Sequence, residues 1–212
     1  LGERIASEIF SMIMKSNPDL VLDLHTDWKR SILYTVLDAN PKGPHQATFN
    51  LTKKIALDTN LIVIQEKEIL KGTLSYNLLV NSVPALTLEL GEPYVINEIN
   101  VSAGVEAIWN VITSMNMCNP YALSSGPDEL EKDNTAKIYH YYDQPHSSTS
   151  GIIRFLAQPG EFIKTGQPFA RIVNAFGKHQ ETMITMHDAI ILGHTDSSVV
   201  FPGMPIMAFG VI

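Results

Sequence analysis

The sequence of 212 residues predicts an α/β domain followed by a small all-β module. Strand-like and helix-like apolar patterns alternate over residues 1–118, which is typical of an α/β layer architecture. Residues 119–149 are expected to form a linker, rich at first in proline, serine, glycine and acidic side chains, and a connecting strand. Residues 150–212 contain short strand-like segments separated by glycine and proline, as all-β modules require.

Three helices are predicted in the first region. An apolar stripe at helical spacing begins near the N-terminus and stops at Asn17-Pro18, because proline cannot continue a helix. A second helix is expected over residues 46–58. The third has the clearest stripe, with Asn97 or Asn100 as its N-cap. That stripe consists of Val101, Val105, Ile108, Ile112 and Met115.

Strands are predicted between these helices. Residues 21–25 form a short strand in which Asp23 and His25 share the face of Val21, because side chains alternate with a period of two. Residues 61–64 and 84–91 are expected to be buried strands, and the second of them ends in an acid and a glycine.

Charge and composition exclude several classes of partner. Twenty-two acidic against fifteen basic residues leave a net charge of −7, which repels the phosphate backbone of nucleic acids. The apolar segments are far shorter than the ~20 residues that cross a bilayer, so we expect no membrane span. A single cysteine, Cys118, cannot form an internal disulfide, which favours a cytoplasmic location.

The last region contains an internal repeat. Residues 162–172 match residues 199–209, so that Gly166 aligns with Gly203 and the flanking apolar positions coincide. The repeat predicts a pseudo-symmetric β barrel or sandwich, and it resembles the half-motif of biotinyl/lipoyl carrier domains. Lys178 occupies the comparable hairpin, but its neighbours differ from the Met-Lys-Met or Asp-Lys-Ala of those carriers. Lys178 is therefore either a swinging-arm lysine or a solvated turn lysine.

Asp23 and His25 are the first candidates for chemistry. They lie two residues apart at the end of a predicted strand, so both side chains can face one ligand site. A neutral imidazole can bind a metal while a nearby carboxylate holds its tautomer. The alternative is a histidine at a strand end that simply pairs with the aspartate.

Glu89 is unusual because it lies within an otherwise apolar strand. A carboxylate in such surroundings is costly unless it is paired, and burial raises its pKa towards neutrality, as suits a general base. The alternative is an acid that caps the following helix.

The order of several motifs resembles the succinylglutamate desuccinylase/aspartoacylase family, zinc-dependent relatives of the carboxypeptidases. These motifs are Asp23-Leu24-His25-Thr26, Ser75-Tyr76-Asn77-Leu78-Leu79 and residues 84–91, followed by the carrier-like module. The resemblance implies a partial zinc-carboxypeptidase-like domain with zinc as cofactor. It further implies that His25 is a zinc ligand, that Glu89 is the general base, and that Asp23 supports His25 without binding the metal. Tyr76 is a candidate for substrate binding, or else a packed aromatic.

One departure from the family pattern is clear. The family's other two zinc ligands come from an upstream His-x-x-Glu motif, and none of the seven histidines of this chain is followed three residues later by glutamate. The chain also begins without methionine, so we expect a piece of a longer protein that is inactive alone.

We therefore expect this chain to be the C-terminal portion of a zinc-dependent amidohydrolase. Its expected substrate is a small molecule similar to an N-acyl amino acid, and the protein is expected to be able to form a homo-oligomer. The alternative from another class is a non-catalytic binding or oligomerisation protein built on a degenerate hydrolase domain. A carrier subunit modified at Lys178 is a third reading. The sequence does not identify the acyl group or the amine.

Overall fold

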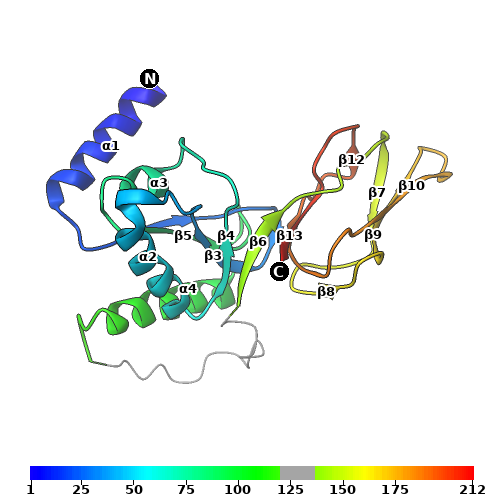
Figure 1. Ribbon diagram of the computed structural model, residues 1–212. Helices are drawn as coiled ribbons and strands as arrows, with labels where there is room; N and C mark the ends of the chain where they lie inside the picture. The colour runs from blue at the N-terminus through cyan, green and yellow to red at the C-terminus, as the bar shows by residue number, and fades with distance from the viewer. Residues whose placement is uncertain (120–136) are drawn as a thin grey trace.

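A computed structural model describes residues 1–119 and 137–212 of the chain. An α/β region and a β-rich region lie side by side, with β6 and β13 between them (Figure 1). The elements of the α/β region are α1 (Gly2–Ser16), β1 (Val21–His25), β2 (Arg30–Ser31), β3 (Leu33–Leu37), a 3₁₀ turn (Gly43–His45), α2 (Gln46–Asp58), β4 (Ile62–Gln65), α3 (Leu74–Leu79), β5 (Ala85–Leu90) and α4 (Glu98–Ser114). The later strands are β6 (Ile138–Tyr142), β7 (Gly151–Phe155), β8 (Phe162–Ile163), β9 (Pro168–Val173), β10 (His179–Ile184), β11 (Ala189–His194), β12 (Val199–Val200) and β13 (Met207–Val211).

The mixed α/β architecture predicted from the sequence is confirmed, and several elements match closely. α2 covers residues 46–58, and the strand at 21–25 is present with the predicted bounds. Asn97 is the N-cap of α4, where its side chain accepts a hydrogen bond from the Ile99 amide. α1 ends where Asn17 adopts a left-handed conformation before Pro18. No helix among the described residues is long and apolar enough to cross a membrane.

Among the elements that were not predicted, two matter for the candidate site, β3 and α3. β3 is buried on both faces, so its sequence lacks the alternation that reveals a half-exposed strand. α3 has only six residues, too few for a helical stripe, and begins where the Thr73 hydroxyl accepts a hydrogen bond from the Tyr76 amide. Both elements help to form the candidate site described below.

The main sheet joins the two regions. Its order is β1-β5-β3-β4-β6-β13-β11-β2, and β8 also pairs with β11. β1 runs parallel to β5, β3 runs antiparallel to β5, and β3, β4 and β6 run parallel to one another. The pairings of β6 with β13 and of β2 with β11 continue this sheet from the α/β region into the β-rich region.

The two faces of the α/β sheet differ in chemistry. α2 and α4 pack on one face, against a core that includes Leu37, Val63 and Leu86. On the other face, α3 packs with Ala85 of β5 and Val21 of β1. Because side chains alternate along a strand, the residues that follow Val21 and Ala85 at two-residue steps lie on this second face. That face carries the candidate site.

The β-rich region forms a second sheet, of order β10-β9-β7-β12, which encloses a core with β11 and β13. The repeat is visible in its turns. Gly166 and Gly203 have φ angles of 80° and 81°, a conformation that glycine adopts without strain. The amide of Gly166 donates to the carbonyl of Thr185, and the amide of Gly203 donates to the carbonyl of Ser147, each at 2.8 Å. The two predicted turns therefore share their backbone geometry, whereas the likeness to biotinyl/lipoyl carriers stays a prediction.

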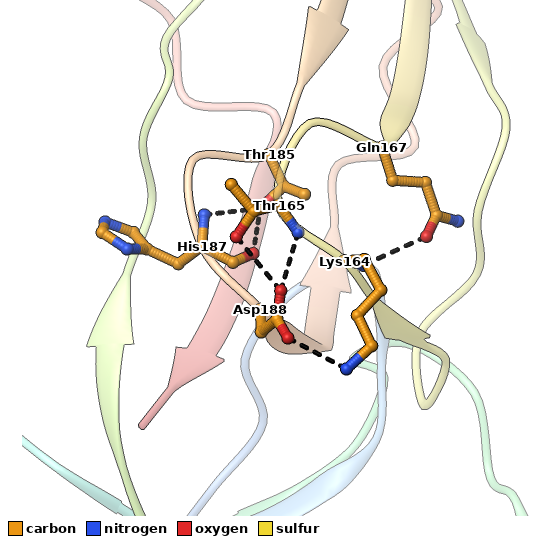
Figure 2. Close-up of polar contacts among 6 residues, drawn as sticks. All are labelled: Lys164, Thr165, Gln167, Thr185, His187 and Asp188. Atoms are coloured by element: carbon orange, nitrogen blue, oxygen red, sulfur yellow. Dashed lines mark hydrogen bonds and ion pairs between the residues drawn. The ribbon is translucent and has the colours of Figure 1, made fainter.

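Asp188 holds the first of these turns in place (Figure 2). It accepts hydrogen bonds from the Thr165 amide at 2.9 Å, from the Thr165 hydroxyl at 3.1 Å and from Lys164 Nζ at 2.9 Å. The Thr165 amide contributes most to lowering the pKa of Asp188, to about 2. Asp188 therefore connects its own loop to the loop that contains Lys164 and Thr165.

The predicted domain limits, 1–118, 119–149 and 150–212, stay predictions. Most of the predicted linker falls in residues 120–136, which lie outside the described residues. The predicted connecting strand corresponds to β6.

Candidate functional site

The site begins where β1 and β5 end beside each other. The two strands are parallel neighbours, and their register pairs His25 with Glu89. The prediction that these two residues lie on adjacent strands and open on one cleft is confirmed by this pairing and by the cavity that both residues line. The roles assigned to them stay predictions.

His25 lies between two carboxylates. Its Nε2 is 3.1 Å from Asp23 Oδ2, and its Nδ1 is 3.7 Å from Glu89 Oε1. The nearer carboxylate favours a proton on Nε2, which leaves the lone pair of a neutral ring on Nδ1. The side chain of His25 is 50% exposed and lines the cavity described below, so a ligand can reach the imidazole ring. Asp23 therefore occupies the position expected of a group that orients the imidazole.

Glu89 is nearly enclosed, with 9% of its surface exposed. Its Oε2 is buried and has no hydrogen-bond partner among the described residues. Burial raises the pKa of Glu89 to about 7, helped by the negative charges of Asp27 and Asp23 and opposed by His25. A carboxylate with this pKa can accept and release a proton near neutral pH. Because Asn97 is the N-cap of the following helix, Glu89 does not serve as its cap.

Asp27 and Tyr34 belong to the same site, although the sequence analysis did not identify them. The Tyr34 hydroxyl donates a hydrogen bond to Asp27 Oδ2. Burial raises the pKa of Asp27, while this hydrogen bond opposes the shift. The register of β3 against β5 pairs Tyr34 with Glu89. Only the two-residue spacing of Asp23, His25 and Asp27 could have drawn attention to the last of these residues.

A cavity of about 540 Å³ extends from this group across the sheet face. Such a volume suits a small organic molecule. Its lining residues come from β1, β3 and β5, from the residues just after β1, β3 and β4, from the loop before α3, from the first turn of α3 and from β6. They are Asp23, His25, Asp27, Tyr34, Val36, Asp38, Glu66, Leu70, Gly72, Thr73, Leu74, Ser75, Thr87, Glu89 and Tyr141. Tyr76 lies on α3 and is not one of these lining residues, so its role in substrate binding stays a prediction.

A complete metal centre is not formed within the described part of the chain. Residues 1–119 and 137–212 contain no cluster of three histidine, cysteine or acidic side chains positioned to hold a metal ion. His25 nevertheless suits a metal, because Asp23 faces one ring nitrogen and leaves the other accessible. This chain thus offers one well-oriented candidate ligand and a neighbouring base.

Comparison with known proteins places these residues in a known catalytic domain. The model of the succinylglutamate desuccinylase/aspartoacylase catalytic domain matches residues 1–115. A search of curated proteins found no significant match.

Solved structures with a similar fold cover nearly the whole chain. A succinylglutamate desuccinylase/aspartoacylase from Rhodobacter sphaeroides is 17% identical with a TM-score of 0.72, and the match covers 98% of this chain and 61% of that one. The ectoine utilization protein EutE (DoeB) from Ruegeria pomeroyi, in its apo form, is 14% identical with a TM-score of 0.73, and the match covers 99% and 64%. At these identities the likeness shows the fold. The chain spans about three fifths of the length of these two structures.

Proposed function

The chain belongs to the succinylglutamate desuccinylase/aspartoacylase family, and we propose that it forms part of a zinc-dependent hydrolase that removes the acyl group from an N-acyl amino acid or a similar small amide. One observation supports the proposal most strongly: His25 and Glu89 are paired on adjacent strands and line the same cavity of about 540 Å³. Glu89 is buried, and its Oε2 has no hydrogen-bond partner within the described part of the chain.

His25 is the zinc ligand that we assign to this chain. Asp23 lies against Nε2, so Nδ1 is the nitrogen that would bind the metal. We assign the remaining ligands to a His-x-x-Glu motif outside this sequence, as the family resemblance implies. When bound, zinc lowers the pKa of a coordinated water to about 7 and polarises the amide carbonyl.

Glu89 moves the proton. As the carboxylate, it accepts a proton from the attacking water at Oε2, the oxygen that has no partner among the described residues. It then delivers that proton to the amine nitrogen as the carbon–nitrogen bond breaks. A pKa near 7 suits both transfers, because the group is neither too weak a base nor too weak an acid at neutral pH.

The test uses the zinc-loaded protein that contains this chain. Amine release from a panel of N-acetyl and N-succinyl amino acids should depend on zinc and should be lost on chelation. Glu161→Gln, which changes an exposed glutamate of the β-rich region, provides a matched control that keeps activity. Hydrolysis that survives complete removal of zinc, or no hydrolysis of any member of the panel, would overturn the proposal.

A further inference from the structure

Tyr34 and Glu89 face the same cavity from neighbouring strands. The antiparallel register of β3 and β5 places them directly opposite each other, so their side chains lie on one face of the sheet. The Cβ atoms of such a pair are about 4.5–5.5 Å apart. Tyr34 is 2% exposed, and both residues line the cavity. A ligand that lies beside Glu89 is therefore within reach of the Tyr34 side chain.

Asp27 fixes the direction of the Tyr34 hydroxyl. The hydroxyl donates a hydrogen bond to Asp27 Oδ2. The Asp27 amide in turn donates to the Gly91 carbonyl at 3.2 Å, which ties the residues after β1 to the end of β5. Burial and the negative charge of Asp27 raise the pKa of Tyr34, so the hydroxyl keeps its proton at neutral pH. Tyr34 therefore uses its single hydroxyl hydrogen as a donor to Asp27.

The oxygen of this hydroxyl keeps its capacity to accept. A tyrosine hydroxyl can accept a hydrogen bond while it donates one. Within residues 1–119 and 137–212, no group donates a hydrogen bond to the Tyr34 oxygen. Donation to a carboxylate also makes the oxygen a better acceptor, because hydrogen bonds in a chain polarise one another. The cavity wall beside Glu89 thus offers an oriented acceptor to a ligand.

This acceptor matches one group at the reacting bond of an N-acyl amine. The nitrogen of that bond carries an N–H donor, whereas the carbonyl oxygen is an acceptor and finds no hydrogen at Tyr34 while the hydroxyl points to Asp27. Because Tyr34 and Glu89 are opposite each other, an N–H that points to Tyr34 keeps its nitrogen next to Glu89. The pair can therefore select both the kind of bond and its orientation.

We propose, on the basis of the function proposed above, that the Tyr34 hydroxyl oxygen accepts a hydrogen bond from the N–H of the scissile amide, with Asp27 as the positioning residue for this contact. The N–H bond stays intact in the reaction. Glu89 adds its proton to the lone pair that the nitrogen gains as the carbon–nitrogen bond breaks, so the amine leaves with both hydrogens. The substrate class is then an amide that has an N–H, and the matching ester is disfavoured.

A matched pair of ligands tests the contact without requiring turnover. O-acetyl-lactate has the shape of N-acetyl-alanine but carries an ester oxygen in place of the N–H. Calorimetry on the metal-free protein that contains this chain should show about tenfold tighter binding of N-acetyl-alanine, because only this ligand donates to Tyr34. Tyr34→Phe should weaken the binding of N-acetyl-alanine about tenfold and leave that of O-acetyl-lactate unchanged. Equal weakening of both ligands would assign Tyr34 a merely structural role and overturn the inference.

Further variants test the role of Asp27 and control for folding. Asp27→Ala should narrow the preference, because the freed hydroxyl can turn its hydrogen towards the ester oxygen, and an unchanged preference would remove the positioning role. Tyr142→Phe is the matched control, since this tyrosine contacts the His187 ring and is not one of the lining residues. Circular dichroism establishes folding. If Tyr34→Phe fails to fold, the double variant with Asp27→Asn, which removes the unpaired buried charge, replaces it. A preference that survives in the folded variant would overturn the inference.

Kinetics of the zinc-loaded protein separate this inference from the proposed function. Tyr34→Phe should lower kcat/KM for N-acetyl-alanine about tenfold relative to that for O-acetyl-lactate, and this ratio decides if neither ligand binds measurably without zinc. Selective binding of N-acetyl-alanine without hydrolysis of any amide would refute the deacylase function and leave the Tyr34 contact standing. Amide hydrolysis with a ratio that Tyr34→Phe does not change would support the deacylase function and refute the contact.

Discussion

Glu89 and Asp188 are carboxylates in opposite environments. Asp188 is exposed and accepts three hydrogen bonds from Thr165 and Lys164, and its pKa falls to about 2. Glu89 is buried, one of its oxygens is unsatisfied among the described residues, and its pKa rises to about 7. The fold itself satisfies the first carboxylate, so that group serves structure. Within residues 1–119 and 137–212, one oxygen of the second carboxylate lacks a donor, which fits the proton transfer that we propose for it.

The same contrast extends to the two regions that contain these residues. In the β-rich region, polar side chains close turns upon themselves, as Thr185 does with the carbonyl and the amide of His187 (Figure 2). On the candidate face of the α/β sheet, polar side chains point into a cavity. Unsatisfied polar groups on a rigid sheet indicate a ligand site more strongly than exposed polar groups on turns.

The largest expected effect is on catalysis by Glu89. Glu89→Gln preserves the shape of the side chain but removes the base, so turnover should fall by ~10²–10⁴ while zinc stays bound. Steady-state kinetics and metal analysis of the zinc-loaded protein measure the two quantities. Asp188→Asn should leave turnover unchanged. Loss of zinc together with activity would assign Glu89 to the metal instead.

A smaller effect is expected from Asp23. Asp23→Asn removes the charge that lies 3.1 Å from His25 Nε2, so zinc affinity should fall by about 10–100-fold. Competition with a chromophoric chelator measures this change, and Asp19→Asn, at an exposed position before the same strand, serves as the control. Unchanged affinity would show that Asp23 does not orient the imidazole.

The two carboxylates should affect stability in opposite pH ranges. The pKa of Glu89 rises from 4.5 to about 7, so the folded state binds more protons, and its contribution to the unfolding free energy is lost as pH rises through about 7. The pKa of Asp188 falls from 3.8 to about 2, so its contribution is present above 3.8 and is lost as pH falls through about 2. Denaturant unfolding of the metal-free chain across pH measures both.

Single variants sharpen this comparison. Glu89→Gln should flatten the pH dependence of stability between 4.5 and about 7, and Asp188→Asn should flatten it below 3.8. The contrast between the carboxylates fails if both variants act in the same pH range.

The sequence revealed the end of the candidate site that contains His25 and Glu89, because local patterns mark it. Asp23 and His25 could be recognised by their two-residue spacing on one strand, and Glu89 could be recognised because it lies within an otherwise apolar strand. The part of the cavity that Asp38 and Glu66 line could not be recognised, since β3 is buried on both faces and no local pattern places Asp38 near Glu66. That proximity comes from the parallel pairing of β3 with β4, which is set by contacts distant in sequence.

The β-rich region shows the same division. The repeat predicted the two glycine turns, because a tight turn leaves a local signature at Gly166 and Gly203. The pairings of β2 with β11 and of β6 with β13 leave no such signature, so the continuous sheet could not be predicted.

The smallest expected effect tests whether the two turns are energetically equivalent. Gly166 and Gly203 have nearly equal φ angles, and a Cβ at either position would meet no heavy atom within 4 Å among the described residues. Alanine there suffers only backbone strain, so Gly166→Ala and Gly203→Ala should each lower the unfolding free energy by about 1–2 kcal/mol. Gly72→Ala, at a glycine without a positive φ, should change it by less. Denaturant titrations compare the three variants. A much larger loss of unfolding free energy for Gly166→Ala would mean that the hydrogen bonds of Asp188 make the turn at Gly166 less tolerant of a side chain than the turn at Gly203. The two halves of the repeat would then share their backbone shape but differ in the energetic cost of the same substitution.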